Sequence, residues 1–372
     1  MEKLLPDICR IQYGFAFDSA KFSDSVGTPL IRIRDVVRGY SETYTTEQCG
    51  DEYVVQDGDM LIGMDGEFNI AHWKGGKAYL NQRVCRLIPT DKINSLYLFY
   101  FMPQALKAIE DKTPFVTVKH LSAKELNKVS VPIPSMAEQE KIATSLQKVD
   151  ELISLRKQQL QKLDELVKAR FVELFGTCAK LKRLEEYASL ITKGASPKWQ
   201  GVDYCEEGVL FVTSENVREG YLDFSKRKYL DDKINEIQPR SMLKRNDILI
   251  NIVGASIGRA AVYNCDEIAN INQAVALVRV DYSRINQTYL MTYLNSAQAI
   301  EMYGKMKKGG ARDNLSLQNI ADLQIPVASM ELQEQFAAFV KQTDKSKLAI
   351  QQSLDKLELL KNALMQKYFG RG

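Results

Sequence analysis

Two long stretches of the chain carry apolar residues at alternating steps of three and four positions. In the first stretch these positions are Ile142, Leu146, Val149, Ile153, Leu160, Leu163, Val167 and Leu174. In the second they are Phe336, Val340, Ile350, Leu354, Leu357, Leu364 and Tyr368. Polar residues interrupt both series, namely Arg156 and Arg170 in the first and Thr343, Lys347 and Lys361 in the second. This spacing predicts two long helices, each with the apolar seam of a coiled coil.

The two helices begin with nearly the same sequence, "PIPSMAEQEKIATSL" at 132–146 and "PVASMELQEQFAAFV" at 326–340. Ser135 followed by Glu138 predicts a helix start with a capping box. The second copy has Leu332 in place of the acid, so its box should be incomplete. Gln139 and Gln333 stand 194 positions apart in the first turns. They are expected either to cap and pack the helix start or to contact a partner protein.

The repeated helix start belongs to a duplication that covers the whole chain. Gly14 corresponds to Gly194, and "PLIRIRDVVRGY" at 29–40 corresponds to "VLFVTSENVREGY" at 209–221. Further along, "DGDMLIGMDGEFNIA" matches "RNDILINIVGASIGRAAV", and "LNQRVCRLIP" matches "INQAVALVRV". Each half has about 130 residues of short apolar runs, broken by Gly and Asp, before its long helix, and this pattern predicts strands with some helical patches.

The pattern therefore predicts an α+β protein in which two mixed α/β domains alternate with two long helices. The expected boundaries are 1–134 and 177–328 for the domains, and 135–176 and 329–372 for the helical regions. Each apolar stripe could simply pack on its own domain. Pairing the helices as an antiparallel coiled coil would hide both stripes and give a pseudo-twofold body. A helix of about 38 residues, roughly 57 Å at 1.5 Å per residue, would then set the spacing between the domains.

Composition narrows the class of protein. Apolar residues make up 45% and charged residues 26%, and neither a membrane-spanning run nor a secretory signal is recognisable. The six cysteines are scattered singly and there are two histidines, so no metal site is predicted and a cytoplasmic location is expected. The net charge of +3 permits nucleic-acid binding through local patches without requiring it.

Known catalytic signatures are not found in the sequence, so no catalytic residue is predicted. The phosphate-binding GxxxxGK[ST], the dinucleotide GxGxxG, the metalloprotease HExxH and the hydrolase GxSxG motifs are all missing. There is also no NPPY-like tetrapeptide of an amino-methyltransferase. "GASIG" at 254–258 follows a strand and could be a cofactor loop, but a sharp turn explains its glycines as well.

Several loops combine basic, small and amide residues, often at matching places in the two halves. Lys and Arg neutralise phosphates, glycine permits close backbone approach, and Asn, Gln and Arg can read base edges. A solvated surface explains any single one of these loops equally well. Taken together they predict a DNA-binding surface that includes Trp73, Lys74, Lys77, Lys119, His120, Lys193, Lys198, Trp199, Arg259, Lys307, Lys308, Arg312 and Asn314.

At this point the chain resembles the specificity subunit of type I restriction-modification systems. The resemblance rests on the early glycine, "PLIRIRDVVRG", "GDMLIGMDG", "NQRVCRLIP" and above all the repeated helix start, and it extends over residues 1–372. It implies a non-catalytic subunit whose two target-recognition domains each read one half of a bipartite DNA site. Because the loops of the two halves differ, that site should be asymmetric.

The resemblance also implies partners and their cofactors. The helices would dock two methyltransferase subunits, which bring S-adenosylmethionine and modify adenine, and a motor-nuclease subunit with ATP and Mg would join for cleavage. This chain itself would hold no cofactor. The coiled-coil and docking positions would be Gln139, Leu146, Ile153, Leu160, Leu163, Gln333, Val340, Ile350, Leu354 and Leu357.

Three other interpretations remain open at this stage. A coiled-coil adaptor could bind proteins and no DNA, although divergent basic loops at matching places argue against it. A methyltransferase or nuclease acting alone is disfavoured by the missing motifs. A spare recognition subunit that exchanges domains with a sibling by recombination has the same sequence features as an active one.

Overall fold

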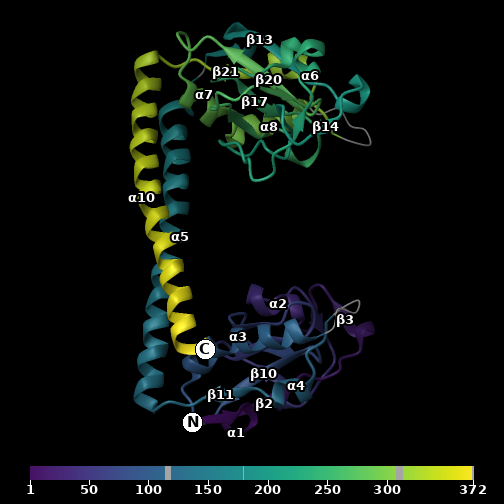
Figure 1. Cartoon of the computed structure of the whole chain (residues 1–372), viewed down its shortest axis with the longest axis vertical. Coiled ribbons are helices and arrows are strands. Elements are labelled where there is room, and N and C mark those ends of the chain that lie inside the picture. The colour runs from purple at the N-terminus through teal and green to yellow at the C-terminus, as the bar shows by residue number, and fades with distance from the viewer. Residues whose placement is uncertain (114–118, 179, 307–312, 371–372) are drawn as a thin grey trace. The chain divides into compact units, whose positions relative to one another are not determined.

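The computed structural model describes residues 1–113, 119–178, 180–306 and 313–370 (Figure 1). The chain forms two compact units. Unit 1 consists of Met1–Lys157 and Gln352–Gly372, and unit 2 consists of Gln158–Gln351. The two predicted long helices are present as α5 (Met136–Phe175) and α10 (Met330–Phe369). Each of them begins in one unit and ends in the other.

The described part of unit 1 contains three sheets and several helices (Figure 1). The first pairs β1 (Glu2–Leu4) with β11 (Ser130–Pro132). The second has the order β2 (Cys9–Tyr13), β10 (Val84–Pro89), β7 (Met60–Gly63) and β8 (Asn69–His72). The third has the order β3 (Phe22–Ser23), β5 (Tyr44–Thr45), β4 (Thr28–Ile31), β9 (Ala78–Leu80) and β6 (Val54–Val55). Besides α5, the helices are α1 (Leu5–Ile8), α2 (Ile33–Arg38), α3 (Ser95–Lys112) and α4 (Ala123–Asn127).

Unit 2 repeats this topology. β12 (Leu181–Arg183) pairs with β21 (Gln324–Pro326), and the next sheet has the order β13 (Ala188–Lys193), β20 (Val275–Val280), β17 (Ile248–Asn251) and β18 (Ala260–Val262). The remaining sheet has the order β14 (Tyr204–Cys205), β16 (Tyr229–Leu230), β15 (Val209–Val212) and β19 (Ala269–Ile271). Its helices are α6 (Lys233–Ile237), α7 (Gln287–Leu294), α8 (Ala297–Met306), α9 (Leu317–Ala321) and the start of α10. The matching strand orders confirm the predicted duplication.

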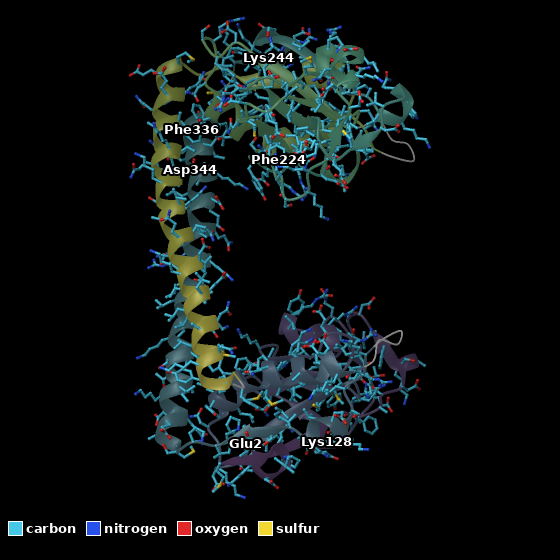
Figure 2. The ribbon with its side chains drawn as sticks, viewed as in Figure 1. Glu2, Lys128, Phe224, Lys244, Phe336 and Asp344 are labelled. Carbon is cyan, nitrogen blue, oxygen red and sulfur yellow. The ribbon has the colours of Figure 1, made fainter. Side chains whose placement is uncertain are left out.

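The far end of each long helix lies in the core of the unit that the other half of the sequence builds. In unit 1 the ring of Phe369 from α10 packs 5.3 Å from Tyr97 and 5.8 Å from Phe101 of α3. In unit 2 the ring of Phe175 from α5 packs 4.6 Å from Tyr289 and 5.6 Å from Phe336, which Figure 2 labels on α10. The phenylalanine that ends each long helix thus anchors that end in an apolar core.

The predicted apolar seams are the least exposed stripes of both helices. Every seam position, including the polar interruptions, is buried or half-buried. Within unit 1, Lys361 of α10 forms an ion pair of 2.6 Å with Asp150 of α5. Within unit 2, Lys347 forms one of 2.6 Å with Asp164. The lysines that interrupt the seam of α10 therefore contact carboxylates of α5 while their stems cover apolar surface.

The repeated glutamines tie each long helix to its own unit. Gln139 is 1% exposed, accepts the backbone N–H of Asn94 at 2.8 Å and donates to the carbonyl of Pro134 at 3.0 Å. Gln333 is 4% exposed and makes the same two contacts, with Asn286 at 2.9 Å and Ala328 at 2.9 Å. Burial and internal hydrogen bonds occupy both carboxamides, which supports capping and packing of the helix start, the first of the two expected roles, rather than contact with a partner protein.

The same contacts explain where the two helix starts differ. The Gln side chain binds a main-chain carbonyl, so proline at 134 and alanine at 328 serve equally well. The capping box at Ser135 and Glu138 is confirmed, since each side chain accepts from the other residue's backbone. At the second start Ser329 alone accepts, from the N–H of Leu332 at 3.3 Å.

A buried tyrosine adds a second tie in each unit. The hydroxyl of Tyr97 donates to the carbonyl of Pro132 at 2.9 Å, and that of Tyr289 donates to Pro326 at 2.7 Å. Burial raises the pKa of Tyr97 to about 12, so the neutral hydroxyl remains the donor at physiological pH. These bonds fasten the first helix after the sheet to the strand that leads into the long helix.

Replacing Gln139 with Ala should lower the free energy of unfolding by about 1–3 kcal/mol, because the buried N–H of Asn94 and carbonyl of Pro134 lose their partner. Glu140 is the matched control, since it is exposed on the same turn and its replacement by Ala should change stability by less than about 0.5 kcal/mol. Urea denaturation of both variants measures the difference. Equal midpoints for the two variants would contradict a structural role for Gln139.

Candidate nucleic-acid interface

Two parallel strands end side by side in each unit, and the loops that follow them form the candidate site. In unit 1, β4 and β9 pair in parallel with Ile31 opposite Leu80. In unit 2, β15 and β19 pair in the same way with Val212 opposite Ile271. We call residues 32–43 and 213–222, which follow β4 and β15, the reading turns of units 1 and 2. Residues 81–83 and 272–274, which follow β9 and β19, are called the tips of the two units. Each turn and its tip leave the paired strands at the same edge.

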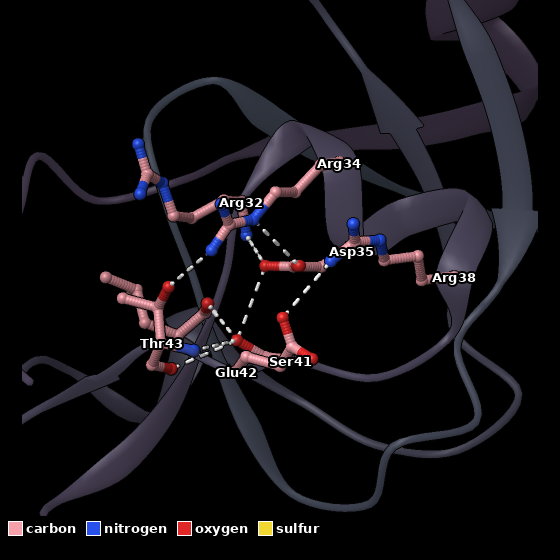
Figure 3. A network of polar contacts seen from close by, with 8 residues as sticks. Arg32, Arg34, Asp35, Arg38, Ser41, Glu42 and Thr43 are labelled. Atoms are coloured by element: carbon pink, nitrogen blue, oxygen red, sulfur yellow. Dashed lines mark hydrogen bonds and ion pairs between the residues drawn. The ribbon is translucent and has the colours of Figure 1, made fainter. Parts of the chain in front are cut away.

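A buried polar residue holds each reading turn. Asp35 is fully buried, and one carboxylate oxygen accepts the N–H of Arg32 at 2.9 Å and the hydroxyl of Ser41 at 3.3 Å (Figure 3). In unit 2, Asn216 is 5% exposed, accepts the N–H of Thr213 at 2.9 Å and donates to the carbonyl of Asp223 at 2.9 Å. The two turns therefore start from the same internal frame.

The exposed residues on the two frames differ in charge. Unit 1 presents three exposed arginines, Arg32, Arg34 and Arg38 (Figure 3). Thr43 accepts from the guanidinium of Arg34 at 3.3 Å, and Glu42 lies 3.3 Å from that of Arg38. At the positions of Arg34 and Arg38, unit 2 presents the exposed carboxylates Glu215 and Glu219. The first turn thus suits phosphate or guanine contacts, and the second does not repeat them.

The tips are held close to the strands by glycine. A side chain at Gly14 would collide with the backbone oxygen of Asn81, and one at Gly194 would collide with that of Ile271. Asn81 and Asn272 then shape each tip, because their side-chain oxygens accept N–H groups of the following residues at 2.9 and 3.1 Å. This close approach explains why the sequence repeats a glycine at that point.

The hairpin loop after β7 joins the site in unit 1. Asp65 and His120 form an isolated bridge, and their side chains lie 2.5 Å apart. Arg83 of the tip lies 3.6 Å from the carboxylate of Asp65 and 3.3 Å from His120 Nδ1. Tip, hairpin loop and residues 119–121 thus form one polar cluster with acidic and basic groups.

The matching cluster in unit 2 has other side chains. Val253 and Asn314 form the equivalent bridge. Buried Asn251 donates to the carbonyls of Ser214 and Val217, and it also contacts Ser256, so it joins the reading turn to the hairpin loop. Arg259 lies exposed on that loop, and the loop glycines serve the sharp turn, with φ of 76° at Gly254 and 88° at Gly258.

The structure corrects one predicted DNA contact. Trp73 is 1% exposed in an apolar cluster, and its indole N–H donates to the carbonyl of Gly76 at 2.7 Å. It therefore packs the core instead of facing nucleic acid. Lys119 is half-buried and donates to the carbonyl of Glu110 at 2.8 Å, so its ammonium is already engaged.

Of the other predicted residues, eight are exposed and three lie outside the described residues. Lys74, Lys77, His120, Lys193, Lys198, Trp199, Arg259 and Asn314 are exposed, with Trp199 at 82%. Arg259 and Asn314 share the unit 2 site, His120 belongs to the unit 1 cluster, and the side chain of Lys74 lies beside Gly39 of the unit 1 reading turn. Lys307, Lys308 and Arg312 lie outside the described residues.

Sequence reasoning missed the arginines of the reading turn, together with Gln82, Arg83 and Gln273 at the tips. A signal for them was present, since "IRIRDVVRG" has arginine at three positions where the second copy has threonine or glutamate. Within the described ranges, no cluster of three His, Cys, Asp or Glu residues could hold a metal ion. The helices of these same ranges include none long and apolar enough to cross a membrane.

Comparison with known proteins identifies the family to which this chain is similar. The family described as type I restriction modification DNA specificity domain matches the chain twice, over residues 1–165 and 183–360. The chain is 30% identical to the type I restriction enzyme EcoBI specificity subunit of Escherichia coli, over 98% of this chain and 84% of that protein.

Two solved structures share the fold. The S subunit of a type I restriction-modification system from M. genitalium matches with a TM-score of 0.58 at 14% identity, over 100% of this chain and 96% of that one. A chain from a structure of complex assembly and conformational transition of the type I R-M system matches with a TM-score of 0.63 at 16% identity, over 99% and 97%.

Replacing Gly194 with Ala should destabilise unit 2 by about 1–3 kcal/mol, because the new methyl group meets the backbone oxygen of Ile271. Gly304 provides a matched control, since a methyl group there meets no atom within 4 Å and the residue lies inside α8. Gly304→Ala should be neutral or stabilising by up to about 1 kcal/mol. Thermal unfolding compares the two, and a harmless Gly194→Ala would refute the close approach at the tip.

Proposed function

The chain belongs to the family of type I restriction-modification DNA specificity proteins, and from this premise we propose that units 1 and 2 each read one half of a split DNA target. Its relatives are named specificity subunits, which agrees with a recognition role rather than catalysis. The supporting observation is the reading turn, in which the same buried frame presents arginines in unit 1 and carboxylates in unit 2. A constant frame with different exposed chemistry suits two unlike half-sites.

The two half-sites should therefore differ, and the target should be asymmetric. Arginine pairs with guanine edges, whereas carboxylates accept from the amino group of cytosine. Arg34 and Arg38 stand where unit 2 has Glu215 and Glu219. Candidate base readers in unit 2 also include Arg259 and Asn314, which lie on one loop cluster.

The proposal extends to the long helices, which would pair as an antiparallel coiled coil in a pseudo-twofold body and set the spacing of the half-sites. The two ion pairs of Lys361 with Asp150 and Lys347 with Asp164 support this pairing. The helices would also dock two methyltransferase subunits, which bring S-adenosylmethionine and act on adenine. A motor-nuclease subunit using ATP and Mg would complete a cleaving complex.

Methylome sequencing tests the recognition proposal. A host that expresses this chain with its neighbouring methyltransferase should show adenine methylation at a split, asymmetric motif. A host with the methyltransferase alone should lack that methylation. If both proteins are made and associate but no new methylation appears, the chain does not direct the enzyme to a target. A protein-binding adaptor would then be the better interpretation.

Shortening both long helices by one heptad, residues 157–163 and 351–357, tests their role as spacers. Seven residues span roughly 10 Å of helix, so the gap between half-sites should shorten by about three base pairs. The half-site sequences should stay the same, which serves as the internal control. Methylome sequencing of a host that makes the shortened protein measures both the gap and the half-site sequences. An unchanged gap would exclude helix length as the determinant of the spacing.

A further inference from the structure

Comparison of equivalent positions in the two units divides the exposed residues into two kinds, those that differ and those that are identical. The proposed half-sites differ in their bases, whereas the sugar-phosphate backbone is the same at both. Residues that read bases are then expected to diverge between the units, and residues that contact the backbone can stay alike. An exposed side chain that is identical at the same point of both units, without a structural task, is thus a candidate for a contact common to both half-sites.

Gln82 and Gln273 meet this description. Each is the central residue of its tip, in "NQR" of unit 1 and "NQA" of unit 2, and each is exposed. The preceding asparagine shapes the tip in both units, and the backbone carbonyls of Asn81 and Asn272 accept from Val84 and Val275 at 2.9 and 3.2 Å. Within the described residues, neither glutamine carboxamide has an internal hydrogen bond. The fold therefore does not account for the shared glutamine.

The positions around the glutamines do diverge. The next residue is Arg83 in unit 1 and Ala274 in unit 2. His120 in the neighbouring bridge becomes Asn314, and Arg34 and Arg38 of the reading turn become Glu215 and Glu219. An unchanged exposed residue that has changed exposed residues around it indicates a contact that does not depend on the bases.

The surroundings of each tip favour a phosphate as that contact. The tip backbone packs closely on residues 14 and 194, because glycine there places no side chain against the backbone oxygens of Asn81 and Asn272. A cation lies beside the second tip, since Lys193 pairs in register with Ala276. Neutral amides commonly donate to phosphate oxygens beside such cations.

We infer that Gln82 and Gln273 donate to the DNA backbone at equivalent points of the two half-sites and position each unit without reading sequence. This inference rests on the proposed function. It divides each tip into three roles: asparagine shapes it, glutamine fixes its register on the duplex, and the third residue takes part in discrimination.

The test measures the DNA affinity of the complex formed by the full chain and its methyltransferase. One fluorescent duplex carries the motif found by methylome sequencing, and the other carries a scrambled sequence. Gln82→Ala and Gln273→Ala should each weaken binding to both duplexes by about fivefold, the effect of one lost hydrogen bond. The double variant should combine the two losses, since the tips belong to separate units. Gln82→Glu should weaken binding further, because a carboxylate repels phosphate.

Gln56 is the matched control, an exposed glutamine before β7, at the end of that strand opposite the hairpin loop. Gln56→Ala should bind like the wild type, and all variants should keep the wild-type melting temperature. Arg83→Ala is the contrasting variant, which should reduce the preference for the motif over the scrambled duplex.

Three outcomes would overturn the inference: unchanged affinity of both glutamine variants, a reduced preference of these variants for the motif over the scrambled duplex, or loss of the methyltransferase with DNA affinity intact. A failure of the proposed function looks different. In that case the wild-type complex itself binds the motif no better than the scrambled duplex.

Discussion

The buried carboxamide at the start of each long helix is the contact on which the rest of the architecture depends. Gln139 joins the first turn of α5 to the first turn of α3, and Gln333 does the same for α10 and α7. A side chain with one donor and one acceptor thereby fixes the direction in which each helix leaves its unit. Because the group is buried, its hydrogen bonds cannot be exchanged for water without a penalty.

The other end of each helix carries an equally strict constraint. Phe369 lies in the core of unit 1 and Phe175 in that of unit 2, so each core includes a residue from the C-terminal end of a long helix. For unit 1 this residue comes from a distant part of the sequence, Gln352–Gly372, whereas unit 2 is one continuous segment. The seam between these ends tolerates polar residues, because lysines there pair with carboxylates. The residues at the ends of the long helices are therefore tightly constrained, and the sequence in the middle of the seam can vary more.

In both units a buried polar residue holds the reading turn in the same way, whereas the exposed side chains of the turn differ. Asp35 and Asn216 are buried and bind backbone groups, and replacing either by an apolar residue would leave those groups unsatisfied. Arg34 and Glu215 face solvent, where a change of charge costs the fold little. Specificity can thus diverge between the units without altering the architecture that presents it.

The sequence by itself determined the duplication, the two long helices with their seams, and the capping of the first helix start. These features follow from periodicity and from short-range hydrogen bonds, which local sequence encodes directly. It also carried the family resemblance that the comparisons confirm.

Tertiary structure alone decided which polar and aromatic residues face solvent. Trp73 beside lysine and glycine has the composition of a binding loop, yet its ring fills a core, and Gln139, which recurs as Gln333, is buried. Gln82 and Arg83, by contrast, are exposed on the tip, whose backbone at Asn81 lies close to Gly14. Burial depends on contacts between residues far apart in the chain, and no local pattern contains that information.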